Sequence, residues 1–285
     1  MALNPEFKGG TSYPIVQFTM RLTVIISYYK ALENLRLILK ALSQQSCREF
    51  EVIVSEDDFN EETIRYFHEY RSLYFFTIRH VHQSADLGFR KNEMLNRSLR
   101  ECKTELVAFI DGDCIPHRHF VKAYIRHTNM GRFLAGRAVM LGEKVSTEVL
   151  RTGKLNKLNF FSLITTESHK VKEAIYNPIF PMAYKTRGLS GRNWGIHKKH
   201  LLDINGFDED YTNAGVGEDV DIEWRLMANG IKRVSIKNKA IVFHLYHPRV
   251  YGQEGVQHNY QLLAKKKELH HIRCLHGIRD LESSD

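Results

Sequence analysis

Short apolar, β-prone runs alternate with amphipathic helical patterns over residues 22–111, and this alternation constrains the fold more than any other feature. The predicted strands are residues 22–27, 50–55, 74–81 and 105–111, and the predicted helices between them are residues 31–43, 62–70 and 90–100. Strands and helices that alternate at this spacing form βαβ units around a mainly parallel sheet. The sequence therefore predicts an α/β fold with a Rossmann-like sheet flanked by helices.

Acidic runs lie where such a fold binds its ligands. They are "SEDD" (55–58) and "DGD" (111–113), each at the end of a predicted strand, and "GEDVD" (217–221) further along. Ligands bind outside the carboxyl ends of the strands in open α/β sheets. A charge at the end of a buried strand is costly unless something pairs with it. The runs together predict a binding site at this edge of the sheet.

Asp111 and Asp113, with Gly112 between them, could converge on one divalent cation. Glycine permits the tight turn that this convergence needs. Mg²⁺ and Mn²⁺ accept oxygen ligands and keep positions open for substrate phosphates. A metal on a diphosphate would neutralise charge on a nucleotide leaving group. The alternative is an Asx-type turn that only closes the strand.

A helix is predicted to begin at the third acidic run. Val220 and Trp224 follow helical spacing, and Asn229 with Gly230 supplies a stop signal. Glu218 and Asp219 would therefore lie at the helix N-terminus. They either complement the helix dipole or supply an ionised general base facing the strand ends.

Other residues could complete a site. Asp57 at the second strand end could accept a hydrogen bond from a base N–H such as uracil N3, or be a solvated loop acid. His244 and His247 follow an apolar run, and a neutral imidazole can ligate Mn²⁺ or be structural. Trp194 could stack on a sugar face or lie in the core.

The second half of the chain is less regular. Residues 133–141 and 240–248 are predicted strands, residues 154–164 are locally amphipathic within the basic stretch 143–187, and residues 256–280 are predicted as a basic C-terminal helix. We expect this half to carry a helical insertion.

Composition narrows the class of protein. Lys+Arg is 41 and Asp+Glu is 33, a net charge of +8, which suits anionic ligands or an anionic membrane surface. No zinc-finger, RNP-type or basic-zipper pattern is present, and acids at the strand ends would repel phosphate, so no nucleic-acid partner is predicted. The four cysteines form no CxxC pair and are predicted to be reduced thiols.

Ordered segments of the chain resemble one known family. They are "VIISYYKALENLRLILKALSQQS", "FEVIVSEDDFNEET", "ADLGFRKNEMLNRSL" and "VAFIDGDCIP". These are similar to the opening strand and helix, the second-strand signature, the leucine-glycine stretch and the DxD motif of family 2 glycosyltransferases of the GT-A fold. "GLSGRNWGIHKKHLLDINGFDEDYTNAGVGEDVDIEWRL" resembles a segment of galactosyl- and N-acetylgalactosaminyltransferases, and "VFHLYHP" resembles the ending of bacterial capsule, lipopolysaccharide and chondroitin-type glycosyltransferases.

The resemblance implies a role for each site residue. The implied donor-binding residues are Glu56, Asp57, Arg90, Asn92, Asp111, Asp113, Asn193 and Trp194. The implied metal ligands are Asp113 directly, Asp111 nearby, and His244 ahead of His247. Asp219 is the implied base that deprotonates the acceptor hydroxyl, and Glu218 orients the acceptor. Glu56 stands where the family often has Asp.

The resemblance also implies a domain organisation. Residues 1–20 form a flexible lead-in or a cloning remnant. Residues 21–255 form one GT-A catalytic domain, with a nucleotide-binding half (21–115) and an acceptor half (116–255). Residues 256–285 carry the C-terminal basic helix.

The implied activity is inverting, Mn²⁺- or Mg²⁺-dependent transfer of a hexose or N-acetylhexosamine from a UDP-sugar to a saccharide acceptor, lipid-linked, in cell-surface polysaccharide synthesis. The alternatives are a sugar nucleotidyltransferase and a non-catalytic sugar-nucleotide-binding protein. A nucleotidyltransferase usually has a Gly-rich, basic phosphate loop after the first strand, where this chain reads "SYYKALEN".

The expected location follows from composition and acceptor. The sequence shows no signal-peptide pattern and no apolar stretch of ~18 residues, so we expect a cytoplasmic protein without a membrane span. The basic stretch 143–187 and the C-terminal helix are predicted to contact the inner face of the plasma membrane. A solvated basic face is the alternative.

Overall fold

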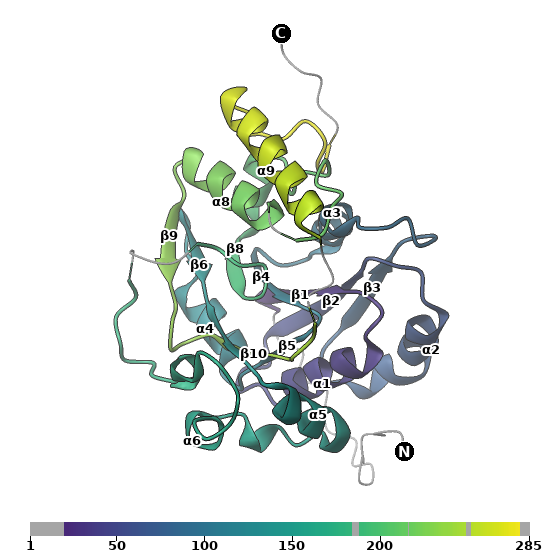
Figure 1. The fold of residues 1–285 in the computed structure, drawn as a ribbon, viewed down its shortest axis with the longest axis vertical. Coiled ribbons are helices and arrows are strands. Elements are labelled where there is room, and N and C mark those ends of the chain that lie inside the picture. Colours follow the sequence, from purple (N-terminus) through teal and green to yellow (C-terminus); the bar gives the residue numbers. More distant parts are fainter. Residues whose placement is uncertain (1–19, 184–187, 216, 249–251, 280–285) are drawn as a thin grey trace.

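The structure is a computed structural model that describes residues 20–183, 188–215, 217–248 and 252–279 (Figure 1). The predicted lead-in lies outside the described residues except at its last position. The described chain is an α/β fold with a mainly parallel central sheet flanked by helices, so the predicted fold class is confirmed.

The larger sheet has the order β3-β2-β1-β4-β8-β6-β9. Its strands are β1 (Leu22–Tyr28), β2 (Phe50–Glu56), β3 (Ile78–His82), β4 (Leu106–Asp111), β6 (Arg132–Ala135), β8 (Trp194–His197) and β9 (Lys232–Ser235). Strands β1 to β4 are parallel and match the four predicted strands, although β3 begins at Ile78, later than predicted, because residues 74–76 form bends. The short strand β8, which sequence reasoning missed, is antiparallel to both β4 and β6.

A smaller sheet has the order β5-β10-β7. Its strands are β5 (Cys114–Pro116), β7 (Arg137–Met140) and β10 (Ile241–His244). The prediction of one strand over 133–141 is wrong, because the chain changes sheets at Gly136: β6 pairs with β8, whereas β7 pairs with β10. A Cβ at Gly136 would lie 2.3 Å from the Asn193 side chain, so this crossing point has no room for a larger residue.

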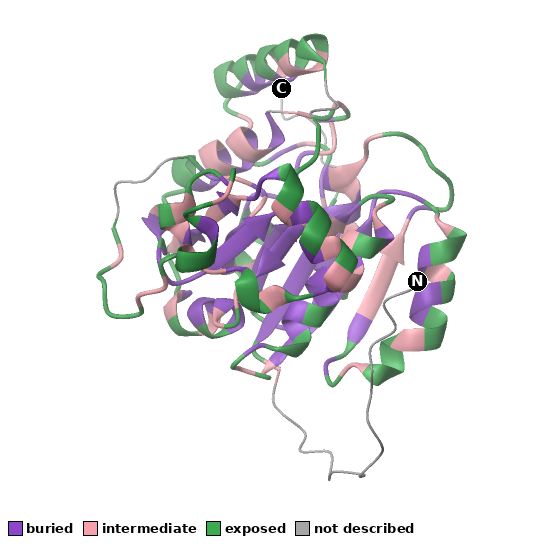
Figure 2. Cartoon of the chain, turned by 60° about the horizontal axis from the view of Figure 1, so that its bottom comes forward, coloured by how far each residue is buried: buried purple, intermediate pink, exposed green. Residues whose placement is uncertain are grey.

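Helices cover both faces of the larger sheet. They are α1 (Leu32–Ser43), α2 (Glu61–Tyr70), α3 (Lys91–Glu101), α4 (Phe120–His127), α5 (Glu143–Thr152), α6 (Phe160–Leu163), α7 (Lys198–Asp203), α8 (Glu218–Ala228) and α9 (Gln253–Glu268). Side chains alternate along a strand, so Val24 and Ile26 pack with α1, α2 and α4, whereas Ile25 packs with α3, α7 and α8. Figure 2 shows the buried strands between helices whose outer faces are exposed.

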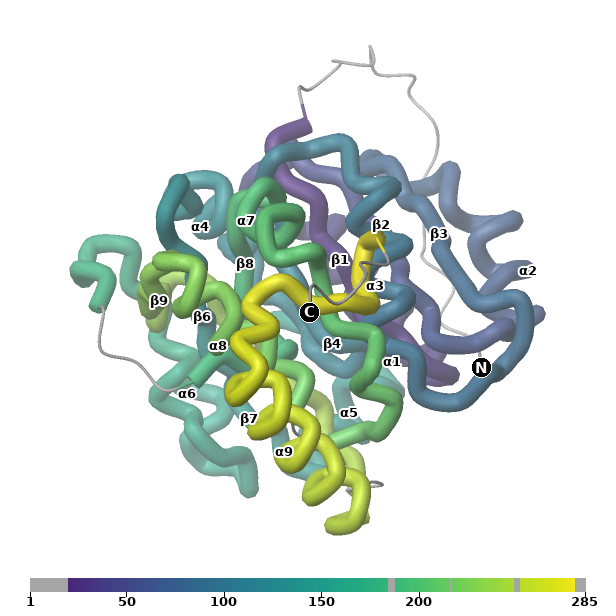
Figure 3. The backbone as a smooth tube through the Cα atoms, turned by 90° about the horizontal axis from the view of Figure 1, so that it is seen from above, coloured from purple at the N-terminus to yellow at the C-terminus, as the bar shows by residue number. Residues whose placement is uncertain are grey.

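The predicted helical insertion consists of α5, α6 and short 3₁₀ turns at residues 155–157 and 171–174. The C-terminal helix is shorter than predicted: α9 ends at Glu268, and the backbone of His270 takes a positive φ of 53°, which an α-helix does not continue. α9 lies over α8 (Figures 1 and 3). Among the described helices, none combines the length and the hydropathy that a membrane span requires.

Candidate active site

The strand ends bring the predicted acids to one edge of the sheet. In the parallel registers, Ser27 of β1 pairs with Asp111 of β4, and Tyr28 pairs with Glu56 of β2. Asp57, which directly follows β2, therefore lies at the same edge as Asp111. The prediction that the first two acidic runs share an edge is confirmed.

Gly112 is required by close packing. It is not among the described glycines with a positive φ. A Cβ at this position would lie 2.8 Å from the Ser27 carbonyl oxygen and 3.2 Å from the Tyr28 Cα. The DGD turn thus passes directly against the end of β1, which only glycine allows. The side chains of Asp111 and Asp113, on either side of Gly112, contact different partners.

Asp113 faces two histidines. In the smaller sheet His244 of β10 pairs with Cys114 of β5, and the Leu245 N–H donates to the Asp113 carbonyl oxygen at 2.9 Å. The Asp113 Oδ2 atom lies 3.4 Å from His244 Nε2 and 3.1 Å from His247 Nε2. One ligand atom from each of these three residues lies within 4.8 Å of the others. We call Asp113, His244 and His247 the metal cluster.

The ionisation of the metal cluster reflects burial and mutual contact. Burial lowers the pKa of His244, which is 9 % exposed. A hydrogen bond to Asp113 raises the pKa of the more exposed His247 to about 9. Burial opposes ionisation of Asp113, but the two histidines outweigh it and its pKa is lowered. The cluster therefore offers one carboxylate and one imidazole that stays neutral at pH 7.

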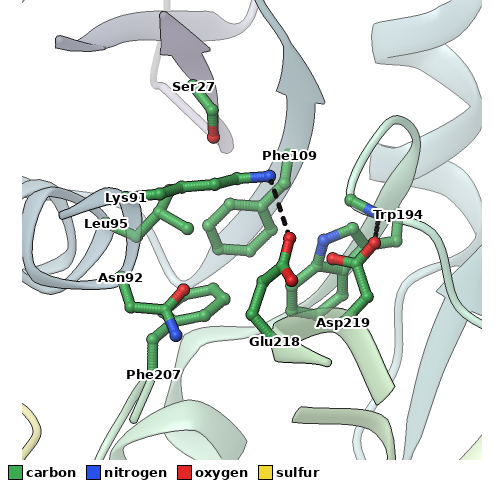
Figure 4. Close-up of a pocket in the computed structure, with 10 residues that line it drawn as sticks. Ser27, Lys91, Asn92, Leu95, Phe109, Trp194, Phe207, Glu218 and Asp219 are labelled. Carbon is green, nitrogen blue, oxygen red and sulfur yellow. Dashed lines mark hydrogen bonds and ion pairs between the residues drawn. The ribbon is translucent and has the colours of Figure 1, made fainter. Parts of the chain in front are cut away.

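A second group of acids surrounds Lys91, the first residue of α3. The Lys91 Nζ atom lies 3.1 Å from Asp111 Oδ1 and 3.9 Å from Glu218 Oε1. Lys91 and Glu218 line a small pocket at the strand ends (Figure 4). Its lining residues are Ser27, Lys91, Asn92, Leu95, Phe109, Gly191, Trp194, Phe207, Glu218 and Asp219. We call this the carboxylate pocket.

Glu218 and Asp219 enter the pocket from the first turn of α8. Burial and the neighbouring Asp219 raise the pKa of Glu218 to about 7, and Glu218 Oε2 has no hydrogen-bond partner. Burial also raises the pKa of Asp219. Burial disfavours the charge of Lys91, but Asp111, Asp219 and Glu218 outweigh that cost and raise its pKa. The lysine is thus a fixed cation among three acids.

Asp219 is held by the backbone of the 188–193 turn. The Gly191 N–H donates to Asp219 Oδ2 at 2.8 Å. A Cβ at Gly191 would lie 2.8 Å from Asp219 Oδ1 and 3.2 Å from Lys91 Nζ, so a side chain there would displace both groups. Asp219 keeps Oδ1 available to a ligand, as a general base requires.

Asp57 and Arg90 are brought together as a pair. The Arg90 backbone N–H donates to Asp57 Oδ2 at 2.9 Å and to Oδ1 at 3.1 Å, and Gln83 donates to Oδ1 at 2.5 Å. Burial raises the pKa of Asp57 despite these hydrogen bonds. Asn92, the next predicted residue on this edge, donates to the Asp208 carbonyl oxygen at 2.7 Å and lines the carboxylate pocket.

Two predicted site residues lie elsewhere. Glu56 is fully buried on the opposite face of the sheet from the pocket, where its Oε2 atom lies 2.6 Å from His80 Nε2. Asn193 is buried with its amide engaged: Oδ1 accepts from the Tyr124 hydroxyl at 2.6 Å, and Nδ2 donates to the carbonyl oxygens of Arg137 and Ala240. The structure therefore corrects both expectations, because neither side chain is open to a ligand.

Trp194 lies in the core and also borders the carboxylate pocket. Its ring stacks on Phe109 with centroids 4.4 Å apart and planes at 17°. Lys91 and Gly191 are the residues that sequence reasoning missed. The signals were present: Lys91 lies between Arg90 and Asn92 in "FRKNEM", and Gly191 lies in "LSGRNWG".

The chain was compared with known families and curated proteins. A family model described as "Glycosyltransferase like family 2" matches residues 20–259. The chain is 26% identical over 250 residues to chondroitin synthase of Escherichia coli, covering 78% of this chain and 34% of that protein. It is 22% identical over 263 residues to the uncharacterized glycosyltransferase YfnE of Bacillus subtilis (strain 168), covering 80% and 66%. The chain thus spans about a third of the length of chondroitin synthase and about two thirds of the length of YfnE.

Solved glycosyltransferases share the fold. The mannosyltransferase PcManGT of Pyrobaculum calidifontis, in complex with GDP-Man and Mn²⁺, has a TM-score of 0.55 and 16% identity, covering 90% of this chain and 64% of that one. S. aureus TarS 1–349 with UDP has a TM-score of 0.59 and 18% identity, covering 87% and 65%. GalNAc-T7 with UDP, GalNAc and Mn²⁺ has a TM-score of 0.64 and 11% identity, covering 87% and 48%. The fold is GT-A.

Proposed function

This chain belongs to glycosyltransferase family 2, and we propose that it transfers a hexose or N-acetylhexosamine from a UDP-sugar to a saccharide acceptor with inversion at the anomeric carbon. The observation that carries this proposal is that the residues flanking Gly112 reach two sites: Asp113 belongs to the metal cluster, and Asp111 contacts Lys91 of the carboxylate pocket. One can hold the donor diphosphate through a cation, and the other can deprotonate the acceptor.

The donor atoms of the metal cluster fit a divalent transition metal. Asp113, His244 and His247 would hold the ion. Two imidazoles and one carboxylate suit Mn²⁺ better than Mg²⁺, which prefers oxygen ligands throughout. When bound, the ion would neutralise charge on the leaving diphosphate. We place Asp111 outside the ligand set, near the ribose, because its carboxylate contacts Lys91.

Asp219 is the proposed base. The Gly191 N–H fixes one carboxylate oxygen and leaves the other to accept the proton of the acceptor hydroxyl. The deprotonated hydroxyl oxygen of the acceptor then attacks the anomeric carbon in a single in-line displacement. UDP leaves from the opposite side, so the configuration inverts. Glu218 would orient the acceptor, and Lys91 would balance the charge of the pocket.

Asp57 is the proposed contact for the uracil base. A carboxylate has about four acceptor positions, so Asp57 can accept from uracil N3 beyond its bonds to Arg90 and Gln83. Two of the neighbouring structures are complexes with UDP and one with GDP-Man. We propose UDP, with Arg90 and Asn92 along the donor edge.

Thermal unfolding tests the donor site directly. The protein is heated with Mn²⁺ plus UDP, Mn²⁺ alone, UDP alone, and Mn²⁺ plus GDP. A ligand at 100 times its Kd stabilises the folded state by ~2.7 kcal/mol. We expect stabilisation only with Mn²⁺ and UDP together, and its loss in Asp113→Ala. No stabilisation with any nucleotide would contradict the proposal.

The proposed acceptor is a lipid-linked saccharide at the inner face of the plasma membrane, in capsule- or lipopolysaccharide-type polysaccharide synthesis. The similarity to chondroitin synthase supports this class of product. The basic helix α9 and the α5–α6 side lie at opposite ends of the view in Figure 1, so they are separate candidate contacts with a membrane. We propose the α5–α6 side, where Phe161 and Ile164 are 84% and 57% exposed. Vesicle binding that does not fall in Phe161→Ser would contradict this choice.

Measurements of catalytic turnover distinguish the alternative functions. Family membership argues against a sugar nucleotidyltransferase. A non-catalytic sugar-nucleotide-binding protein would bind Mn²⁺ and UDP but show neither transfer nor hydrolysis of any UDP-sugar. A screen of UDP-sugars with Mn²⁺, with release of UDP as the readout, distinguishes it from the proposed transferase.

A further inference from the structure

A second small pocket lies away from the active site, at the start of β10. It is lined chiefly by Lys122, Arg126, His127, Tyr176, Pro178 and Lys239. His244 of the metal cluster is the last residue of the same strand, about 10 Å from its first residue at the rise of an extended chain. This pocket is therefore separate from the donor and acceptor positions proposed above.

The pocket concentrates positive charge. Besides burial, the nearby Arg126 lowers the pKa of Lys239, and Lys239, Arg126 and Arg132 lower the pKa of His127. All of these charged neighbours are cations. Among the described residues, no carboxylate forms an ion pair with Lys122 or Arg126. Cations brought this close repel one another unless an anion lies between them.

Lys239 is held in place by the chain. Its side chain is only 3% exposed, and its ammonium donates to the carbonyl oxygens of Pro178, at 2.9 Å, and Phe180. An ammonium has three N–H donors, so one remains for a ligand. Burial and the nearby Arg126 lower the pKa of Lys239, a cost that a bound anion would relieve.

We propose that this pocket binds a phosphate group. Arg126 supplies a planar guanidinium that can donate two parallel hydrogen bonds to phosphate oxygens, and Lys122 and Lys239 supply point charges. The adjacent Ile179 and Phe180 are 88% and 52% exposed, so apolar surface borders the phosphate position. A phospholipid headgroup and a soluble phosphate compound share the recognised chemistry. The proposal does not depend on sugar transfer.

The test uses a pair of charge-matched double variants. The K122Q/R126Q variant removes two exposed cations from the pocket, and the K40Q/R65Q variant removes two exposed cations from α1 and α2. Both are made in full-length protein carrying Asp113→Ala and are studied with EDTA, so that phosphate cannot bind through a metal ion. Titration calorimetry measures inorganic phosphate, and co-sedimentation measures vesicles of phosphatidylcholine with and without phosphatidylglycerol.

The expected result is a loss of affinity of about tenfold or more in K122Q/R126Q and none in K40Q/R65Q. This loss in the calorimetric arm indicates a soluble phosphate ligand, and the same loss only with phosphatidylglycerol vesicles indicates a lipid phosphate; either supports the proposal. Equal affinity in both double variants, or no binding in either arm, overturns it.

Discussion

Asp113 belongs to the metal cluster and Asp111, two residues earlier, contacts the lysine of the carboxylate pocket, yet the charges of the two sites are balanced differently. Asp111 lies beside Lys91, a lysine whose pKa is raised by the surrounding acids. Asp113 faces His244 and His247, one of which has a lowered pKa. The carboxylate pocket therefore carries its own permanent cation, whereas the metal cluster has partners that can lose their charge.

This difference assigns the two regions different chemistry. Neutral imidazole nitrogen atoms are free to ligate a cation. Carboxylates balanced by a lysine stay ionised at neutral pH more readily than carboxylates alone, and an ionised carboxylate can act as a base. Four substitutions test this division, in order of decreasing expected effect.

Asp113→Ala should have the largest effect because it removes the carboxylate of the metal cluster. Loss of metal-based charge stabilisation is worth several kcal/mol, so we expect transfer to fall by ~10³-fold or more. Steady-state kinetics and Mn²⁺ binding would both report the loss. Asp203→Ala, which removes an exposed ion pair with Lys199 on α7, is the control. Full activity of Asp113→Ala without Mn²⁺ would remove the distinction between the two regions.

Asp219→Asn should lower kcat by ~10²–10⁴-fold, the usual contribution of a general base. Binding of Mn²⁺ and UDP should be unchanged, because Asp219 lies in the carboxylate pocket and not in the metal cluster. Glu218→Gln should lose less activity than Asp219→Asn, and mainly through a higher KM for the acceptor. If Glu218→Gln lost more kcat than Asp219→Asn, the roles of the two acids would be exchanged.

Lys91→Met should convert the pocket into an unbalanced group of acids. Without the lysine the pKa of Asp219 rises further, so less of the base is ionised at neutral pH. We expect a loss of ~10–100-fold near pH 7 that diminishes as pH rises. The pH dependence of kcat/KM measures it, and Lys91→Arg should retain the wild-type profile. A loss that is equal at all pH values would assign Lys91 to substrate binding alone.

The strands of the fold also differ in how well the sequence predicted them. β1, β2 and β4 were predictable because each is a continuous buried apolar run, and their ends located the acids of the site. β8 was missed because four residues with a central glycine become a strand only through pairing with β4 and β6, which are distant in sequence. Residues 116–255 depend on such nonlocal contacts more than residues 21–115 do.

The errors at the site also have identifiable structural causes. Side chains alternate along a strand, so Glu56 and Asp57 could not both face the donor, and Glu56 contacts His80 instead. Asn193 follows a glycine turn, as ligand-binding residues often do, but its amide donates to the carbonyl oxygens of Arg137 in β7 and of Ala240, which precedes β10. Lys91 lies on a helix and not at a strand end, so the sequence pattern of acids at strand ends does not point to the cation that balances them.

Glu218→Gln should have the smallest effect, on folding stability. The folded-state pKa of Glu218 is raised from 4.5 to about 7. The folded state therefore binds its proton more tightly than the unfolded state, and wild-type stability falls as pH rises from 4.5 through 7. The E218Q variant lacks this loss and should gain on the order of 1–2 kcal/mol relative to wild type between about pH 5 and about pH 8. Urea unfolding at both pH values measures the gain. A constant difference would mean that Lys91 already holds Glu218 ionised throughout this pH range.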